Sequence, residues 1–180
     1  MLKNNIILCG FMGSGKTTIG KLLSKRLNID FIDIDNEICS KLGISINQIF
    51  EIYGETYFRN LENCEVSLIA KLQSKVISTG GGTFLNKENV SKLSKSGKIF
   101  FLKASKNVIK SRLKDDCSRP LLKNLNDEAF DKLFYKRCQL YESICDIIID
   151  ANKSEQSVCQ DIINFIENQK EDIQTWKKFL

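Results

Sequence analysis

Five short apolar runs alternate along the chain with longer segments whose apolar residues recur at helical spacing. The runs lie at Asn5–Cys9, Phe31–Asp33, Val76–Ser78, Lys98–Leu102 and Ile147–Ile149. Each is almost continuously apolar, which is typical of strands covered on both faces. Helical spacing is clear at 19–27 and again at 158–166, where Ser154 or Ser157 is the expected N-cap. The alternation predicts an α/β protein with a parallel sheet covered by helices.

Two stretches depart from this alternation. About forty residues, 36–73, separate the second and third runs, more than one crossover helix needs, and we expect this insertion to carry a substrate pocket. Residues 115–126 are polar, contain the only proline and are expected to form a mobile lid. Residues 1–168 are therefore interpreted as one domain. Residues 169–180 form a charged tail that either extends the last helix or stays loose.

The segment between the first run and the first helical pattern has the sequence GFMGSGKT at residues 10–17, which fits G-x-x-x-x-G-K-[ST]. After a strand, such a loop surrounds a phosphate with backbone N–H groups, and the following helix N-terminus favours negative charge. Lys16 is placed to reach the terminal phosphates and the Thr17 hydroxyl to ligate Mg²⁺. We predict that a nucleoside triphosphate is bound by Gly13, Ser14, Gly15, Lys16, Thr17 and Thr18.

Composition narrows the remaining chemistry. Histidine is absent, which excludes Ser-His and Cys-His nucleophile schemes and the usual zinc enzymes. Seven dispersed cysteines without a C-x-x-C pair indicate reduced thiols. The net charge of +5 suits small anionic ligands but is too diffuse to indicate nucleic acid. With no membrane-length apolar run and no secretory signal, we expect a cytoplasmic protein that acts as a monomer away from membranes.

Carboxylates and glycines follow two of the predicted strands. Asp33 and Asp35 end the second run, where alternation would place both on one side of an extended segment, at the edge where open α/β sheets bind ligands. One is suited to the Mg²⁺ shell and the other to a substrate hydroxyl, although Asp35 could instead cap a helix starting near Asn36. Gly80, Gly81 and Gly82 follow the third run and leave room for a ligand against the main chain.

Four arginines are further candidates. Arg59 lies in the insertion and Arg137 on the helix after the lid, and each alone would more often be structural or solvated. Arg119 lies in the lid, from where it can reach a transferred phosphoryl group. Arg112, on the preceding helix, can stack on a nucleotide base.

Taken together, these motifs resemble the shikimate kinase family. The family patterns G-x-M-G-x-G-K-[ST]-T-x-G, F-x-D-x-D, G-E-x-x-F-R, T-G-G-G, R-P-L-L and R-x-x-x-Y occur in order at 10–20, 31–35, 54–59, 79–82, 119–122 and 137–141. The resemblance implies a three-layer α/β/α P-loop fold like that of nucleoside-monophosphate kinases, with a five-stranded parallel sheet in the order 2-3-1-4-5. It also implies ATP-dependent phosphorylation of the 3-hydroxyl of shikimate, with Mg²⁺.

The same resemblance implies roles at the acceptor end of the site. Asp35 would bind the ring hydroxyls of shikimate and assist removal of the attacking proton. Arg59 and Arg137 would hold the substrate carboxylate, a task that suits the planar guanidinium fork. Gly80, Gly81 and Gly82 would bind the substrate through the main chain.

At the nucleotide end, Lys16 and Arg119 would stabilise the migrating phosphoryl group, and Asp33 would organise Mg²⁺ waters beside Thr17. Arg112 would cover the adenine.

The adenine-side loop spans residues 150–156. Asn152 and Gln156 are alternative candidates for its contact with the adenine, and we assign Asn152.

Two other functions stay open at this point. Another kinase of the same fold, acting on gluconate or a nucleoside monophosphate, would share the phosphate loop and the lid arginine, but would not obviously require all the acceptor residues together. A GTPase-like switch is suggested by N-K-S-E at 152–155, which resembles the guanine-reading N-K-x-D element. However, no D-x-x-G motif follows the third strand.

Overall fold

Five parallel strands form one sheet in the order β2-β3-β1-β4-β5. The structure is a computed structural model that describes residues 4–113 and 126–177, of which 169–177 are described by their backbone alone. The strands are β1 (Asn5–Cys9), β2 (Asp30–Asp33), β3 (Lys75–Ser78), β4 (Gly97–Lys103) and β5 (Ile147–Asp150). The predicted sheet and strand order are confirmed, and each predicted strand end lies within one residue of the observed one.

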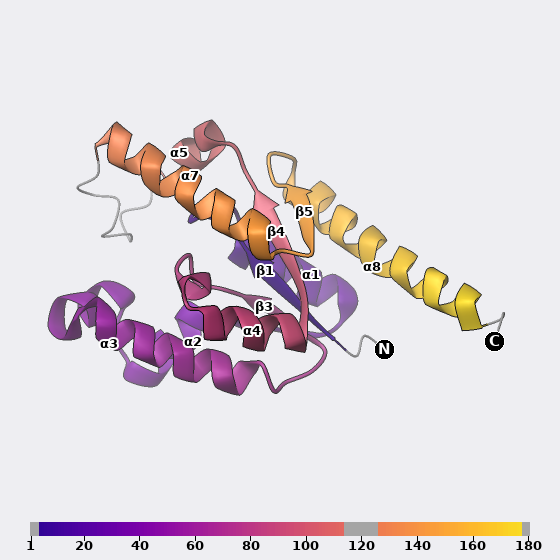
Figure 1. The fold of residues 1–180 in the computed structure, drawn as a ribbon, viewed down its shortest axis with the longest axis horizontal. Coiled ribbons are helices and arrows are strands. Elements are labelled where there is room, and N and C mark those ends of the chain that lie inside the picture. Colours follow the sequence, from indigo (N-terminus) through magenta and orange to yellow (C-terminus); the bar gives the residue numbers. More distant parts are fainter. Residues whose placement is uncertain (1–3, 114–125, 178–180) are drawn as a thin grey trace.

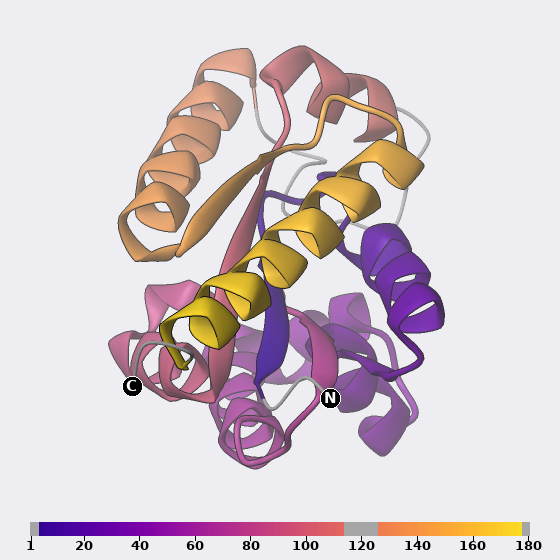
Figure 2. The same cartoon turned by 90° about the vertical axis from the view of Figure 1, so that its right-hand side faces the viewer.

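Helices cover both faces of this sheet, which gives the predicted three layers (Figures 1 and 2). On one face, α1 (Lys16–Leu27) and α8 (Glu155–Lys177) pack against each other. On the other face, α4 (Lys87–Ser96) and α7 (Asp127–Ile144) pack against β4. The short helix η1 (Thr83–Leu85) leads from β3 towards α4, and α5 (Lys106–Leu113) follows β4. Because all strands are parallel, their carboxyl ends lie together at one end of the sheet. This is where open α/β sheets bind ligands.

The predicted insertion at 36–73 consists of two packed helices, α2 (Ile34–Leu42) and α3 (Ile46–Ile69). α3 begins with a capping box, in which the Ser45 and Gln48 side chains each accept a hydrogen bond from the other's backbone N–H. It is kinked at Gly54, whose φ of 81° lies in the left-handed region that favours glycine. α3 therefore has two segments of different direction, and the second segment carries Arg59.

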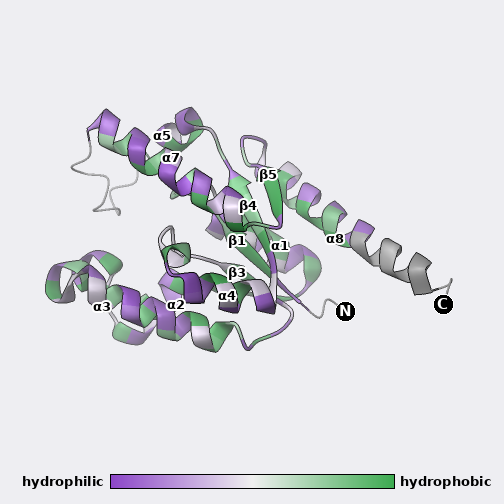
Figure 3. Ribbon diagram, in the orientation of Figure 1, coloured by the Kyte–Doolittle hydropathy of each residue, from purple (hydrophilic) through white to green (hydrophobic). Residues whose placement is uncertain are grey.

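The core is centred on the middle strands. All five residues of β1 are buried, and Figure 3 shows β4 and the edge strand β5 as largely hydrophobic. The expectation that every strand is covered on both faces is wrong at the sheet edges. Ile148 of β5 is 49% exposed, and no residue of β2 is fully buried. β2 and β5 are the two edge strands of the sheet, where the helices of the outer layers leave part of each strand exposed.

The last helix settles which of the two predicted caps is used. Ser154 precedes α8, and its Oγ accepts a hydrogen bond from the backbone N–H of Ser157 at 3.3 Å. The helix continues without a break to Lys177, so residues 169–177 extend it rather than forming a separate loose tail. No helix in the described ranges is long and apolar enough to cross a membrane.

Candidate active site

The loop between β1 and α1 is held in a tight curve by glycine geometry. Gly13 and Gly15 have φ values of 77° and 95°, which side chains rarely adopt. A Cβ on Gly10 would lie 2.7 Å from Ser14 Oγ and 2.9 Å from Leu102 O. The Ser14 side chain is accordingly buried against Gly10 rather than facing outward, so we expect Ser14 to serve a phosphate only through its backbone N–H.

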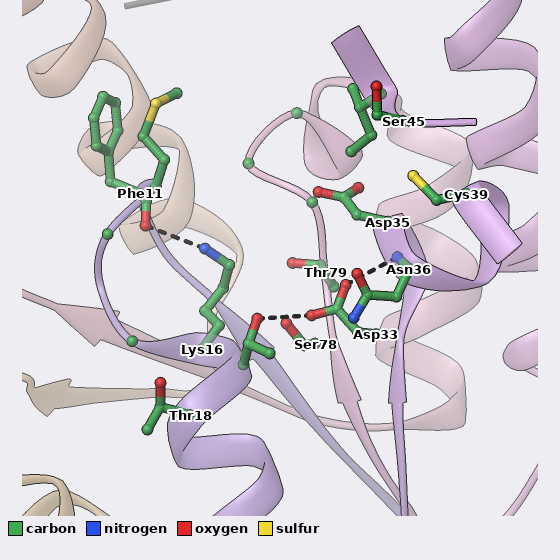
Figure 4. Close-up of a pocket in the computed structure, with 18 of the residues that line it drawn as sticks. Phe11, Lys16, Thr18, Asp33, Asp35, Asn36, Cys39, Ser45, Ser78 and Thr79 are labelled. Atoms are coloured by element: carbon green, nitrogen blue, oxygen red, sulfur yellow. Dashed lines mark hydrogen bonds between the residues drawn. The ribbon is translucent and has the colours of Figure 1, made fainter. Parts of the chain in front are cut away.

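Lys16 begins α1 and lies across the mouth of this loop. Its ammonium group donates to Gly10 O at 2.9 Å. It also donates to Phe11 O at 3.1 Å, the contact drawn in Figure 4. These contacts hold the positive charge at the N-terminus of α1, where the helix dipole also favours an anion. The loop therefore has the geometry of a phosphate site.

A cleft of about 1140 Å³ runs from this loop to the insertion. It is lined by the phosphate loop, the start of α2, both segments of α3, the glycine turn (residues 80–82) and α7. The volume exceeds the roughly 300–1,000 Å³ of most small-molecule sites. There is room for a nucleotide and a second small ligand, bound in one continuous space.

Asp33 and Asp35 both line this cleft, but not as neighbours on one extended strand. β2 ends at Asp33, which caps α2 by accepting from the Asn36 N–H at 3.3 Å, and Asp35 lies in the first helical turn. The predicted alternation and the possible capping role of Asp35 are therefore wrong. Asp33 Oδ2 instead accepts from the Thr17 hydroxyl at 2.8 Å, whereas Asp35 points towards the glycine turn (Figure 4).

The glycine turn is shaped by side chains packed against its α-carbons. A Cβ on Gly80 would lie 2.5 Å from Asp35 Oδ1 and 2.8 Å from Glu62 Oε1, and one on Gly82 would lie 2.4 Å from Arg59 Nη1. Any larger residue at Gly80 or Gly82 would displace these groups. The glycines therefore bring the carboxylate of Asp35 and the guanidinium of Arg59 close to the main chain, as well as leaving space for a ligand.

Arg59 is held by two carboxylates of its own helix. Its Nη1 donates to Glu62 at 2.8 Å, and its Nε and Nη2 donate to Glu55 at 3.2 and 3.0 Å. Burial by itself would lower the pKa of the Arg59 guanidinium, but Glu62 and Glu55 more than offset this and raise the pKa. Glu62 is 1% exposed and Glu55 is largely exposed, so only the Glu62 contact is shielded from water.

Arg137 reaches the same cleft from α7. Its buried Nη1 has no hydrogen-bond partner among the described residues, which is costly for a cationic donor. One helical turn later, the buried Tyr141 hydroxyl donates to Gly81 O at 2.7 Å and ties α7 to the glycine turn. Burial raises the pKa of Tyr141, so this hydroxyl stays a donor. Among the described residues, Arg137 thus keeps a donor available for an anion, on the helix that Tyr141 ties to the glycine turn.

The adenine side differs from the prediction in one residue. Arg112 lies in the cleft and bridges the phosphate loop to the 151 loop, donating to Gly13 O and Ser14 O at 3.3 Å and to Ala151 O at 3.2 Å. Asn152 is directed elsewhere: its Oδ1 accepts from the Ser105 N–H at 2.8 Å, outside the cleft.

Neither Asn152 nor Gln156 lines the cleft. The residues of this region that do so are Ala151, Lys153, Glu155 and Val158. Arg119 and the rest of the predicted lid up to residue 125 lie outside the described residues.

Sequence reasoning missed Glu62, the carboxylate that fixes Arg59. The signal was present, because Arg59 and Glu62 stand three residues apart in a helical segment, a spacing at which side chains meet. What spacing did not reveal is that Glu62 is buried against Gly80 and that Arg59 lies against Gly82, so that the pair belongs to the site.

Comparisons with known proteins agree with this geometry. The family model described as shikimate kinase matches residues 12–167. A shikimate kinase of Caldicellulosiruptor saccharolyticus is 49% identical over 162 residues, which cover 86% of this chain and 93% of the relative. The structure of Acinetobacter baumannii shikimate kinase in complex with shikimate superposes with a TM-score of 0.88 at 32% identity, covering 93% of this chain and 95% of that one.

A gluconokinase of Sinorhizobium meliloti superposes with a TM-score of 0.60 at 14% identity, covering 97% of this chain and 98% of that one, a likeness of fold alone. The match of the family model to residues 12–167 and the 49% identity to the Caldicellulosiruptor saccharolyticus relative agree with the phosphate loop, the glycine turn and the two arginines of the cleft. The chain belongs to the shikimate kinase family.

Proposed function

We propose that this chain transfers the γ-phosphoryl group of ATP to the 3-hydroxyl of shikimate, giving shikimate 3-phosphate and ADP. The observation that carries this proposal is the pair of arginines opposite the phosphate loop. Arg137 has a buried donor without a partner among the described residues, and Arg59 lies against Gly82 on the same cleft. Two guanidinium groups suit a carboxylate, and Asp35 beside them suits the hydroxyls of a small ring.

At the nucleotide end, the phosphate loop would hold the triphosphate by its backbone N–H groups, with Gly13, Ser14, Gly15, Thr17 and Thr18 as contacts. Lys16 would stabilise the charge on the transferred group, since its ammonium is already fixed at the loop by two carbonyls. Arg119 would assist it from the lid.

Arg112 would cover the adenine. Its contacts with the phosphate loop and with Ala151 support a role in shaping that end of the cleft.

The residues present also fit Mg²⁺. The Thr17 hydroxyl and the Asp33 carboxylate meet at 2.8 Å and both line the cleft, and hard oxygen donors of this kind are what Mg²⁺ prefers. With one hydroxyl and one carboxylate from the protein, the ion would be completed by water and phosphate oxygens, as is usual for Mg²⁺. Bound there, Mg²⁺ would neutralise negative charge on the phosphates.

At the acceptor end, Arg59 and Arg137 would hold the shikimate carboxylate, and Gly80, Gly81 and Gly82 would bind the substrate through the main chain. Asp35 would orient the 3-hydroxyl and accept its proton. A loose phosphoryl transition state needs little activation of the nucleophile, so positioning is the larger part of this role. Transfer would be direct and in line, without a covalent enzyme intermediate.

We further propose that the protein acts as a monomer in the cytoplasm. The six cysteines within the described ranges are free thiols, as expected in a reducing compartment.

The assignment is tested by ADP release from purified protein supplied with ATP and Mg²⁺. Shikimate should stimulate release strongly, whereas gluconate and AMP should not. Robust turnover of gluconate or AMP without any response to shikimate would overturn the proposal.

A further inference from the structure

Thr83 lies immediately after the glycine turn and is fully buried, at 0% exposure. Its backbone is fixed on both sides, because its N–H donates to Gly80 O at 3.3 Å and its carbonyl accepts from Asn89 Nδ2 at 3.2 Å. Its hydroxyl donates to Glu62 Oε1 at 2.6 Å, a buried contact across 21 residues of sequence. The hydroxyl is therefore a fixed donor presented to a carboxylate of α3.

Glu62 uses its two carboxylate oxygens for two different partners. Oε1 accepts from Thr83, and Oε2 accepts from Arg59 Nη1 at 2.8 Å. At 1% exposure, water cannot replace a lost donor. A carboxylate held at both oxygens has one orientation, whereas one held only at Oε2 can rotate and carry the guanidinium with it.

We propose that Thr83 is a positioning residue, whose hydroxyl orients Glu62 so that Glu62 holds Arg59 at the acceptor end of the cleft. This inference rests on the proposed function, in which Arg59 binds the acceptor carboxylate. The two neighbouring contacts of the same turn agree with it: Glu62 packs on Gly80, and Arg59 packs on Gly82. The hydrogen bond from Thr83 to Glu62 is thus a third contact, directly after the glycine turn, with the Arg59–Glu62 pair.

The test is Thr83→Val, which keeps shape and burial but removes the donor. We expect the KM for shikimate to rise about fivefold to twentyfold, since a hydrogen bond to a charged group is lost and part of that loss reaches the substrate. The KM for ATP and kcat should stay within about twofold, because the phosphate loop is untouched. Thr83→Ser, which keeps the hydroxyl and loses a buried methyl, should leave the shikimate KM near that of the unmodified protein.

Ser67→Ala is the matched control on α3, the helix that carries Arg59 and Glu62. The Ser67 hydroxyl donates to Asn63 O and accepts from Lys92, with no contact to the Arg59–Glu62 pair, so its loss should not change the shikimate KM. If Thr83→Val does not fold, as judged by circular dichroism, Thr83→Ala and Thr83→Ser replace it, since these two differ only in the hydroxyl.

Arg59→Lys, measured in parallel, separates the two ways of failing. If Arg59→Lys raises the shikimate KM while Thr83→Val (or the Ala variant, compared with Ser) does not, the role of Thr83 is refuted and the acceptor role of Arg59 stands. If the Ser variant, which keeps the hydroxyl, is as impaired as the Val variant, the hydroxyl does not preserve the shikimate KM, which also refutes the role of Thr83. If Arg59→Lys has no effect on the shikimate KM, the acceptor role itself is wrong.

Discussion

The two ends of the cleft are built in different ways. The proposed nucleotide end is centred on a contiguous loop, residues 10–17, where the proposed ligand contacts are mainly backbone N–H groups and one lysine held by carbonyls of the same loop. The proposed acceptor end joins α2, α3, the glycine turn and α7, and it depends on side chains of these elements that contact one another, among them the buried carboxylate of Glu62. The first end therefore takes most of its groups from one stretch of sequence, with Arg112 added from α5, whereas the second takes its groups from four separate elements.

The largest expected effect is a fall in the rate of phosphoryl transfer, caused at the phosphate loop rather than at the acceptor end. Lys16→Ala removes the charge fixed at the phosphate loop, and kcat should fall by about 10²–10³-fold or more, as when other transition-state donors are removed. The measurement is the rate of shikimate-dependent ADP release. Lys21→Ala, an exposed lysine on the same helix, is the control and should retain full activity. Near-normal turnover of Lys16→Ala would show that the loop does not act as described.

The next effect concerns the acceptor end alone. Arg137→Ala should raise the KM for shikimate about 10–100-fold, the range expected when a hydrogen bond to a charged group is lost. The KM for ATP should hardly change. Steady-state kinetics with each substrate varied in turn will show this, with the exposed neighbour Lys136→Ala as control. A selective loss of ATP affinity would show that Arg137 acts at the nucleotide end of the cleft and would contradict its assignment to the acceptor end.

A smaller effect tests the packing of the glycine turn. In Gly82→Ala the new Cβ would lie 2.4 Å from Arg59 Nη1, so the guanidinium must move and the shikimate KM should rise severalfold. Gly81→Ala is a matched control for the unliganded protein, because its Cβ meets nothing closer than the Tyr141 hydroxyl at 4.0 Å. Thermal unfolding without ligands should show little change for Gly81→Ala. Equal shikimate KM values for Gly82→Ala and the unmodified protein would contradict the close packing of Arg59.

The smallest effect concerns the link between α7 and the glycine turn. Tyr141→Phe removes the hydroxyl that donates to Gly81 O and should lower the free energy of unfolding by about 1 kcal/mol. Chemical denaturation measures this change. We also expect a rise of at most a few-fold in the shikimate KM, because Arg137 lies one turn away on the same helix. An unchanged unfolding free energy would mean that this hydrogen bond contributes nothing net.

The comparison also explains what could be predicted from sequence. The strands and the phosphate loop were predictable, because apolar runs mark the strands and the loop motif is contiguous. The placement of Asp35 in the cleft was predicted for an incorrect reason, since β2 ends two residues earlier and a helical turn carries the side chain. Patterns of alternation do not reveal where a strand gives way to a helix that its last residue caps.

Other features depended on tertiary contacts. The link from Thr83 to Glu62 joins residues that are 21 positions apart and becomes visible only when η1 lies against α3. The direction of the Asn152 side chain could not be predicted from sequence either, because it depends on a hydrogen bond from the backbone N–H of Ser105, 47 positions away. Sequence therefore gives the residues of a site more readily than the contacts that orient them.

The separate construction of the two ends is tested most directly by titrating shikimate, in the absence of nucleotide, into Lys16→Ala and Arg137→Ala by calorimetry. We predict that Lys16→Ala binds shikimate with nearly the Kd of the unmodified protein, whereas Arg137→Ala binds it at least about tenfold more weakly. Loss of shikimate binding in Lys16→Ala, together with retained binding in Arg137→Ala, would contradict the account.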